Sequence, residues 1–406
     1  MNILKIEETC LTLSNGLRVV YRPVLSDVAY CGFAVDAGTR DESEKEQGMA
    51  HFVEHLIFKG TKKRKAWHIL NRMEAVGGDL NAYTNKEEMV VYTSFLNEDL
   101  PRAVELLVDI VFHSTFPQRE IEKETEVIID EIQSYEDSPS ELIFDDFEDM
   151  IFRGHPLGRN ILGKPEILRQ FRTEDALAFT QRLYHPSNMV FFLQGSADFK
   201  RLVRMLEKLT SDIPAGSVEN LRTPPPLYVP ERLVVPKDTH QAHVMLGSRG
   251  YDAYNDKRTA LYLLNNILGG RLNVAMRERR GLVYNVESNL TSYTDTGAFC
   301  IYFGTDPEDV DTCLNLTYKE LKCLRDTKMS DTQLHAAKKQ LTGQIRVASD
   351  NYENNALGMA KTFLHYNKFE NMDEVCKRIE ALTATDLLEV ANEMFAEDHL
   401  SMLIYR

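Results

Sequence analysis

The sequence is poor in cysteine and has no long apolar run, and each of these absences argues against a class of protein. Its six cysteines are scattered, with no C-x-x-C pair. That usage is typical of a reduced cytoplasmic protein rather than a disulfide-bonded secreted one. The amino terminus carries acids, Glu7 and Glu8, where a signal peptide needs basic residues followed by an apolar segment. No run has the length of a membrane span. We therefore expect a cytoplasmic protein that does not bind membranes.

Positive charge is also scarce. The chain of 406 residues has 47 Lys and Arg against 62 Asp and Glu, a formal net charge of −15. Nucleic acids and anionic membranes attract basic surfaces, so this balance argues against both as partners. It favours neutral or basic ligands, although a surface charge that keeps the protein in solution explains it equally well.

The first half of the chain predicts strands interleaved with helices. Two strands, 10–13 and 17–21, flank Ser14-Asn15-Gly16, and Asn-Gly is a strong hairpin signal. A third strand is expected at 29–35. Apolar residues at helical spacing predict further helices. The expected helices are 69–76, 97–112, 118 to about 135, 171–184 and a segment ending near 209. Residues 79–95 are expected to form a strand, a turn and a second strand at 89–95, and a further strand is expected at 189–195.

A proline-rich stretch, 213–230, divides the chain almost in half and reads as a stiff linker. The second half begins like the first, with strands at 232–235 and 242–247 and a helix at 259–270 that ends in glycine. We predict an α+β protein of two homologous domains, each an antiparallel-rich sheet covered by helices. The predicted boundaries are 1–212 for the first domain, 213–230 for the linker and 231–406 for the second domain.

The most informative motif is His51-Phe52-Val53-Glu54-His55. On a helix, residues i and i+4 share a face, so His51 and His55 can bind one ion. Two histidines and a later carboxylate make a zinc site with an open position for water. The alternative is an amphipathic helix with surface histidines. The candidates for the third ligand lie on the acidic helix near 118–135 and just after it: Glu122, Glu124, Glu126, Asp130, Glu131, Glu136 and Asp137.

The sequence resembles the pitrilysin–insulinase family, which includes the mitochondrial processing peptidases. That family carries the inverted zinc motif H-x-x-E-H. Its third ligand is a glutamate on a later helix, in a pattern like E-x-x-V-I-x-x-E, which this sequence matches from Glu124 to Glu131. The resemblance implies that Glu131 is the third ligand and that Glu124 supports the site.

Other segments extend the resemblance over nearly the whole chain. Leu80-Asn81-Ala82-Tyr83-Thr84 is similar to the family's substrate-binding edge strand, and 154–159 and 184–189 are similar to landmarks of its first half. In the second half, 268–272 and 277–284 match the segments that hold an arginine–tyrosine pair, here Arg277 and Tyr284. If the sequences of the two halves are aligned, His51, Glu54 and His55 correspond to Leu261, Leu264 and Asn265. The second domain is therefore expected to lack a metal site.

The resemblance implies a zinc-dependent endopeptidase with one zinc ion per chain. Glu54 would act as general base on a zinc-bound water, the nucleophile that attacks the peptide bond. A peptide would pair with the edge strand at Asn81, Ala82 and Tyr83 by β-augmentation. Arg277 and Tyr284 would contact the substrate backbone and stabilise the oxyanion.

Family members of this length form half of a clamshell around a chamber that takes unfolded peptides. The resemblance therefore implies a homodimer with composite active sites, in which Arg277 and Tyr284 serve the zinc site of the partner chain. Two rival hypotheses are a non-catalytic subunit of a heterodimeric peptidase and a zinc-binding module without activity. The zinc residues are all present in this chain, which favours the enzyme.

Overall fold

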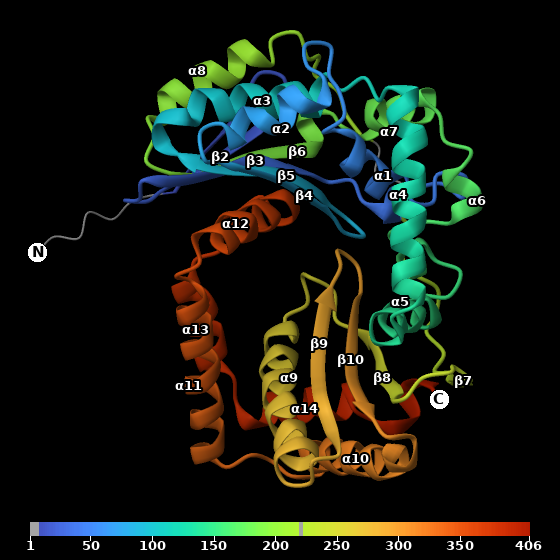
Figure 1. The fold of residues 1–406 in the computed structure, drawn as a ribbon. Coiled ribbons are helices and arrows are strands. Elements are labelled where there is room, and N and C mark those ends of the chain that lie inside the picture. Colours follow the sequence, from blue (N-terminus) through green and yellow to red (C-terminus); the bar gives the residue numbers. More distant parts are fainter. Residues whose placement is uncertain (1–7, 219–221) are drawn as a thin grey trace, which may run out of the picture. The chain divides into compact units, whose positions relative to one another are not determined.

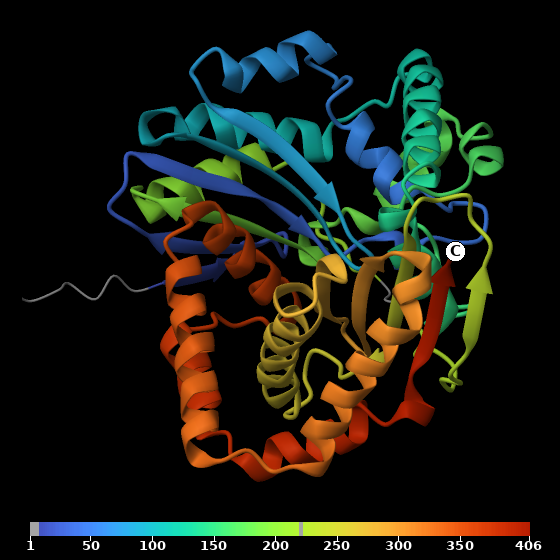
Figure 2. The ribbon, with the colours of Figure 1, turned by 60° about the horizontal axis from the view of Figure 1, so that its bottom comes forward.

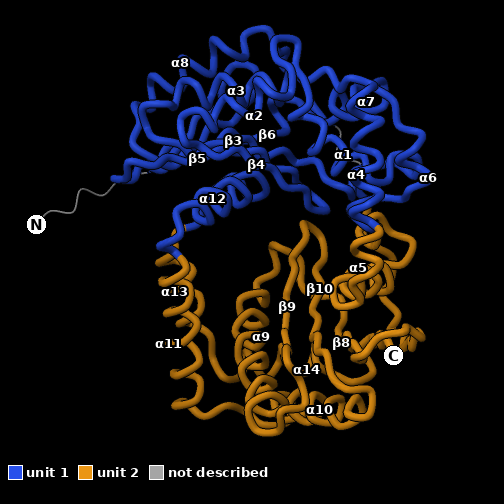
Figure 3. The backbone as a smooth tube through the Cα atoms, in the orientation of Figure 1, with its two compact units in different colours: residues 1–132, 160–222, 349–370 blue, residues 133–159, 223–348, 371–406 orange. Residues whose placement is uncertain are grey.

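Two β-sheets, each with its own helices, make up residues 8–218 and 222–406, the part of the chain that the computed structural model describes (Figures 1 and 2). The chain divides into two compact units (Figure 3). Unit 1 comprises residues 1–132, 160–222 and 349–370, and unit 2 comprises residues 133–159, 223–348 and 371–406. Each unit therefore contains a segment from the other half of the sequence.

Unit 1 is built on a six-stranded sheet with the order β1-β2-β6-β3-β5-β4. Its strands are β1 Thr9–Thr12, β2 Arg18–Pro23, β3 Val28–Val35, β4 Asp79–Thr84, β5 Met89–Leu96 and β6 Met189–Gly195. Only the β2–β6 pair is parallel. The predicted hairpin is confirmed, since Thr12 pairs with Arg18 across a turn in which Gly16 has a φ of 94°.

The main core of unit 1 fills one face of this sheet. Strand β3 explains the arrangement: Cys31, Phe33 and Val35 point into this core, while Ala34 points to the opposite face. A strand buried on both faces has a nearly continuous apolar sequence, as β3 does. The helices of this part of unit 1 are α1 Met49–Leu56, α2 Ala66–Glu74, α3 Leu100–Phe112, α4 Gln118–Glu136, α6 Pro165–Leu168, α7 Thr173–Leu183 and α8 Phe199–Leu209.

The other face of the unit 1 sheet is covered by a helix from much later in the chain, α12 Tyr352–Tyr366. Its apolar residues Met359 and Phe363 pack against Val190 and Phe192 of β6. The Arg18 guanidinium on β2 donates to the Leu364 carbonyl at 3.1 Å near the end of this helix. Residues 349–370 thus complete the first sheet.

Unit 2 is built on a five-stranded sheet with the order β7-β11-β8-β10-β9. Its strands are β7 Arg232–Val235, β8 Ala242–Gly250, β9 Val283–Ser292, β10 Gly297–Thr305 and β11 Ser401–Tyr405. Only the β7–β11 pair is parallel. Without β1, the first sheet has this same order and the same single parallel pair. The α+β prediction of two homologous sheet-and-helix domains is therefore confirmed.

The helices of unit 2 cover both faces of its sheet. One face packs against the longer helices of the second half, and the other packs against α5, in which Ile143 and Phe147 contact Met245 and Tyr405. These helices are α5 Pro139–Ile151, α9 Arg258–Leu272, α10 Val310–Asp326, α11 Asp331–Ala348, α13 Met372–Ala381 and α14 Ala384–Met394, with a π-helical segment at Asn273–Glu278. Helix α5 comes from the first half of the sequence, as α12 comes from the second.

The proposed boundaries at 212 and 230 describe two halves of the sequence, whereas the compact units exchange α5 and α12 between those halves. The predicted boundaries follow a repeat in the sequence, whereas the compact units are defined by contacts in the folded chain. Contacts do not test descent from a repeat, so the division into 1–212, 213–230 and 231–406 stays a prediction. Within the described ranges, every cysteine is unpaired. No helix in these ranges combines the length and the apolar character needed to span a bilayer.

Candidate metal centre and active site

The helix that carries the H-x-x-E-H motif, α1, is held at its amino end by a glycine and a buried carboxylate. Gly48 has a φ of 94°, and a Cβ there would meet the Leu162 carbonyl at 2.8 Å. The buried Glu42 carboxylate accepts hydrogen bonds from the amides of Gly48 and Ala50, at 3.0 and 2.8 Å. Together these contacts satisfy amides at the start of the helix and fix His51 one turn later.

The structure brings together the three predicted ligands, His51, His55 and Glu131. Their donor atoms all lie within 4.8 Å of one another. The Nε2 atoms of both histidines are 3.9 Å from Glu131 Oε2. Two donors each about 2.1 Å from one zinc ion lie at most about 4.2 Å apart, so the two separations of 3.9 Å fit a shared ion. The donor set, two imidazoles and a carboxylate, is also one that zinc prefers in catalytic sites.

The surroundings of His51 favour its neutral form, which is the form that binds a metal. Burial, aided by the neighbouring His55, lowers the pKa of His51 to about 3. Its Nδ1 atom is buried without a hydrogen-bond partner in the described chain, while Nε2 is the atom nearer Glu131. The free lone pair of Nε2 therefore faces the ligand cluster.

Glu124 supports the cluster from the same helix as Glu131, two turns earlier. Its Oε2 lies 3.1 Å from His55 Nδ1, and its Oε1 lies 2.8 Å from Lys59 Nζ. Burial alone would raise the pKa of Glu124, but the hydrogen bonds to His55 and Lys59 hold that pKa below its usual value. An ionised Glu124 accepts the proton of His55 Nδ1, which leaves His55 Nε2 as the ligand atom.

Glu54 lies between the two histidines in sequence and is half-buried. Burial raises the pKa of its carboxyl, and the charges of His55 and Glu131 both act on it. The geometry thus leaves one acid of the motif beside the ligand cluster but outside the set of three donors. A carboxyl in this position can accept a proton from a molecule that reacts at the cluster.

The predicted substrate strand is β4, at the edge of the unit 1 sheet. Among the described strands it pairs with β5 alone, through Asn81 with Tyr92, Ala82 with Val91 and Tyr83 with Val90. Helix α1 packs directly against β4, so the open edge lies beside the helix that carries the histidines. An added peptide strand would therefore run next to the ligand cluster.

Comparison with known proteins agrees with this geometry. A family model described as "Insulinase (Peptidase family M16)" matches residues 18–165, and one described as "Peptidase M16 inactive domain" matches residues 170–341. The chain is 32% identical to an uncharacterized zinc protease of Rickettsia felis over 403 residues, which is 97% of this chain and 96% of that protein. It is 31% identical to the uncharacterized zinc protease YmxG of Bacillus subtilis over 400 residues, 97% of each chain.

The chain belongs to the M16 peptidase family. This confirms the pitrilysin–insulinase resemblance, and the names of the relatives support zinc as the metal and peptidase activity in general. The first family match contains His51, His55 and Glu131, and the inactive-domain match contains Leu261 and Asn265 in their place. In α9, the Asn265 side-chain amide donates to the Ser288 carbonyl of β9 at 2.8 Å.

Two solved structures share the M16 fold. A protease from Helicobacter pylori has a TM-score of 0.92 and 21% sequence identity, with 98% of this chain and 99% of that chain covered. A peptidase M16 inactive domain from Pseudomonas fluorescens has a TM-score of 0.90 and 19% identity, with 98% of both chains covered. At these identities the likeness establishes the fold alone.

Arg277 and Tyr284, the proposed substrate-binding pair, belong to unit 2, whereas the ligand cluster belongs to unit 1. Arg277 is exposed in the π-helical segment, and Tyr284 on β9 is 81% exposed. The chain turns between them at Gly281, which has a φ of 64° and donates its amide to the Arg277 carbonyl. Both side chains are thus free to contact another molecule.

Sequence reasoning missed two hydroxyl groups beside Glu54. Tyr184 is 7% exposed, and burial together with the charge of Glu54 raises the pKa of its phenol. Its hydroxyl has no hydrogen-bond partner in the part of the chain that the structure describes, whereas the buried Thr84 hydroxyl donates to the Glu54 carboxyl and opposes the rise in its pKa. Tyr184 stood out in the sequence only as part of a family landmark, while Thr84 ends the predicted edge strand.

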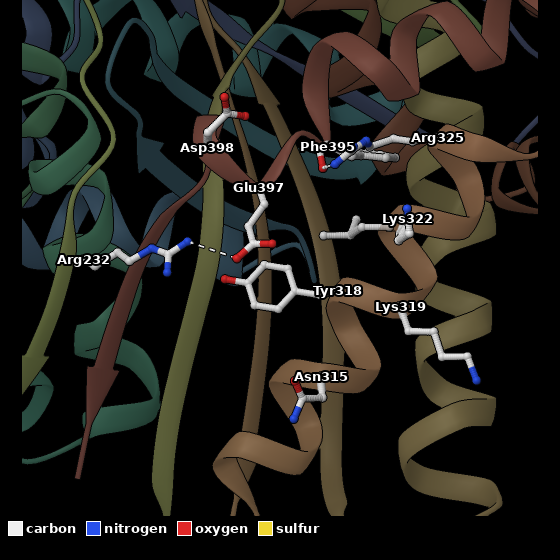
Figure 4. Close-up of a pocket in the computed structure, with 10 residues that line it drawn as sticks. Arg232, Asn315, Tyr318, Lys319, Lys322, Arg325, Phe395, Glu397 and Asp398 are labelled. Carbon is white, nitrogen blue, oxygen red and sulfur yellow. Dashed lines mark hydrogen bonds and ion pairs between the residues drawn. The ribbon is translucent and has the colours of Figure 1, made fainter.

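A cavity of about 670 Å³ in unit 2 is a separate feature (Figure 4). Its walls include Tyr318, Phe395 and the ion pair between Arg232 and Glu397. In this pair a guanidinium nitrogen of Arg232 lies 3.4 Å from Oε1 of Glu397. It contains no histidine or cysteine, and one of its two acids is already paired. This cavity therefore lacks the donor set for zinc, and the chemistry points to the unit 1 cluster.

Proposed function

We propose that this M16 protein is a zinc-dependent endopeptidase that holds one zinc ion per chain through His51, His55 and Glu131. The observation that carries the proposal is the position of these three donors: they lie on α1 and α4, and α1 packs against the open edge strand β4. The same few elements thus supply the metal donors, a carboxyl for proton transfer and an edge for an extended peptide.

When bound, zinc would act as a Lewis acid and make a water molecule more acidic near neutral pH. Glu54 would accept a proton from the attacking water and deliver it to the nitrogen of the leaving amine. Its half-buried position beside the cluster supports this role. Glu124 orients His55, and Lys59 in turn neutralises Glu124.

The substrate is an extended, unfolded segment, because only an extended backbone can add to the edge of β4. Asn81, Ala82 and Tyr83 would bind it mainly through backbone hydrogen bonds, which tolerate many side-chain sequences. Such a site suits an endopeptidase that acts inside a closed chamber, where folded proteins are excluded by size.

The active site is composite and the protein is a homodimer in this proposal. Arg277 and Tyr284 of the partner chain would contact the substrate backbone, with the Arg277 guanidinium and the Tyr284 hydroxyl as donors to the developing oxyanion. The exposure of both side chains supports a role in contacting another molecule.

The alternative is a non-catalytic or merely zinc-binding subunit of a heterodimeric peptidase. The inactive-domain match does not favour it, because that match covers residues 170–341, the part without the ligand cluster. A closed structural zinc site would need a fourth protein ligand. The cluster found among the described residues contains three.

Digestion of a mixed pool of unfolded peptides, read by mass spectrometry, tests the proposal. We expect internal cleavage that stops when a chelator removes the metal and returns when zinc is added. The products also define the sequence preference. A zinc-loaded protein that cleaves nothing in the pool would favour the non-catalytic alternative.

A further inference from the structure

A second surface of unit 1 stands out against the acidic character of the chain. From His55 to Met73 there is no Asp or Glu, while this segment contains Lys59, Lys62, Lys63, Arg64, Lys65 and Arg72. The formal net charge of the whole chain is −15, so this segment has the opposite sign from the chain as a whole. Beyond His55 and Lys59, which belong to the zinc site proposed above, it comprises the loop after α1 and most of α2.

We define the basic patch by the residues that the fold gathers around α2: Lys62, Lys63, Arg64, Lys65, Trp67, His68, Leu70, Arg72 and Arg102. Its centre is a cavity of about 310 Å³ that six of them line. A cavity of this size, at the lower end for ligand pockets, accommodates one or two side chains rather than a large cofactor.

The arginines form the rigid floor of this cavity. Arg64 donates two hydrogen bonds to Glu105, at 2.7 and 2.8 Å, and also contacts Asp109. Arg72 contacts the same Glu105 at 3.2 Å, and Arg102 donates to the Arg72 carbonyl at 3.1 Å. Nearby carboxylates largely compensate the charges of these arginines. The arginines therefore shape the cavity but add little net positive charge to it.

The lysines supply the uncompensated charge. Lys62, Lys63 and Lys65 are exposed, and no carboxylate in the described ranges pairs with them. Their loop is fixed, because the Thr61 hydroxyl accepts from the amides of Lys63 and Arg64 and donates to Asp109. A preorganised loop loses little conformational entropy when an anion binds to its lysines.

The patch also offers apolar contacts. Trp67 is 68% exposed and Leu70 is 50% exposed, while Ile69 and Met73 on the other face of α2 are buried. The Trp67 ring meets His68 edge to face, with the ring centroids 5.2 Å apart. Exposed tryptophan and arginine are the residue types that protein–protein interfaces favour, and Trp67 here lies among Arg64, Arg72 and Arg102.

We propose that the basic patch is a docking surface for an acidic peptide segment of a partner protein, with an apolar side chain against Trp67 and Leu70. A short segment is favoured over a bilayer or a nucleic acid for an electrostatic reason. Charges are screened beyond about 8 Å at physiological ionic strength, so a short segment senses mainly the patch. A flat membrane or a long polyanion would also lie over neighbouring surface of a chain in which acids outnumber bases.

Trp67 is the only tryptophan of the chain, so fluorescence excited selectively at tryptophan reports on this patch, without emission from the 17 tyrosines. The full chain with zinc, as the Glu54→Gln variant so that the probe is not cleaved, is titrated with a short peptide of Glu and Asp around a central Leu. We expect a saturable blue shift that weakens strongly between about 0.05 M and about 0.5 M salt. The matching peptide of Gln and Asn should give none.

Charge-reversal variants test the location. K62E/K63E/K65E should weaken binding by at least about tenfold, because the lysines carry the attraction. The matched control K200E/R204E/K208E makes the same charge change on exposed residues of α8 in the same unit and should leave the affinity unchanged. Trp67→Ala, followed by anisotropy of a labelled peptide, should also weaken binding, and circular dichroism checks that each variant is folded.

Three results would overturn the proposal. The first is the absence of a shift with the acidic peptide, or an equal shift with its neutral counterpart. The second is an equal loss of affinity in the α8 control, which would mean non-specific attraction. The third is a shift with phosphatidylglycerol vesicles or single-stranded DNA but not with the peptide, which would assign the patch to a membrane or to nucleic acid instead.

Discussion

Glu124 Oε2 lies 3.1 Å from Nδ1 of His55, on the opposite side of the imidazole from the atom that faces Glu131. The ligand helix α4 thus contributes twice to the cluster, once with a donor and once with a group that orients another donor. Lys59 pairs with Glu124 and compensates its charge, so Lys59 also helps to hold the cluster in place. In the zinc site proposed for this M16 protein, two residues that are not donors thus help to hold the donor set in place.

Glu124→Gln should therefore weaken zinc binding while leaving all three donors in place. Loss of a carboxylate behind a ligating histidine typically costs about 10–100-fold in metal affinity. Competition with a chromophoric chelator measures the change. Glu126→Gln, on the exposed face of the same helix, is the control and should bind zinc like the wild type. Equal affinity in both variants would mean that Glu124 does not orient His55.

Gly48→Ala should destabilise unit 1 at the start of the zinc helix. The residue would have to keep a φ of 94°, and its Cβ would meet the Leu162 carbonyl at 2.8 Å. We expect a loss of about 1–3 kcal/mol in the free energy of unfolding, measured with urea. Gly270→Ala in α9 has open space and no positive φ, so it should be neutral or slightly stabilising. A neutral Gly48→Ala would show that α1 can start without the left-handed residue.

The sequence was sufficient to predict the local parts of the site. The spacing of His51 and His55 predicts a shared helix face, and the family pattern singles out Glu131 on a second helix. Strands such as β3 and β5 follow from apolar runs with turn residues between them. Residue roles such as that of Glu54 remain predictions, because proximity alone does not assign a proton transfer.

The exchange of α5 and α12 between the two sheets could not be predicted. Met359 and Phe363 are spaced like the apolar face of any helix, and nothing local indicates that they pack on β6, more than 150 residues earlier in the chain. The same holds for the buried hydroxyl of Tyr184 beside Glu54, since that position depends on the tertiary fold. Local patterns predict which faces are apolar, and only the fold decides what covers them.

The docking of α12 should make stability depend on pH through Glu88. Burial alone would raise the pKa of this carboxyl, but hydrogen bonds to His365 and Lys361 of α12 lower the pKa to about 2. Because the folded pKa lies below the usual 4.5, the ionised group stabilises the fold above pH 4.5. This contribution, about 3 kcal/mol, is lost as the pH falls from about 4.5 toward 2.

Urea unfolding of the wild type and Glu88→Gln as a function of pH, with chelator present in both, measures this effect. The difference in unfolding free energy should be largest near neutral pH and should shrink as the pH falls below 4.5. A difference that stays constant down to pH 2.5 would contradict the assignment to ionised Glu88.

Mixed dimers test the composite site. If Arg277 acts on the zinc site of the partner, a mixture of Glu54→Gln and Arg277→Ala chains contains sites in which both residues are intact. After random exchange of equal amounts, about a quarter of the wild-type activity should return in the homodimer we propose. Each variant alone should stay inactive. No recovery after verified subunit exchange would place Arg277 in the active site of its own chain, and an active Arg277→Ala chain on its own would place it outside any active site.

The most direct test of the central claim is a paired measurement of zinc content and peptide cleavage on Glu54→Gln. We expect this variant to keep one zinc per chain, since its ligands are unchanged, and to lose cleavage by about 10²–10⁴-fold, the usual contribution of a general base. The control Glu126→Gln should retain both properties. Cleavage at the wild-type rate by a zinc-loaded Glu54→Gln protein, or loss of its zinc together with its activity, would contradict the account.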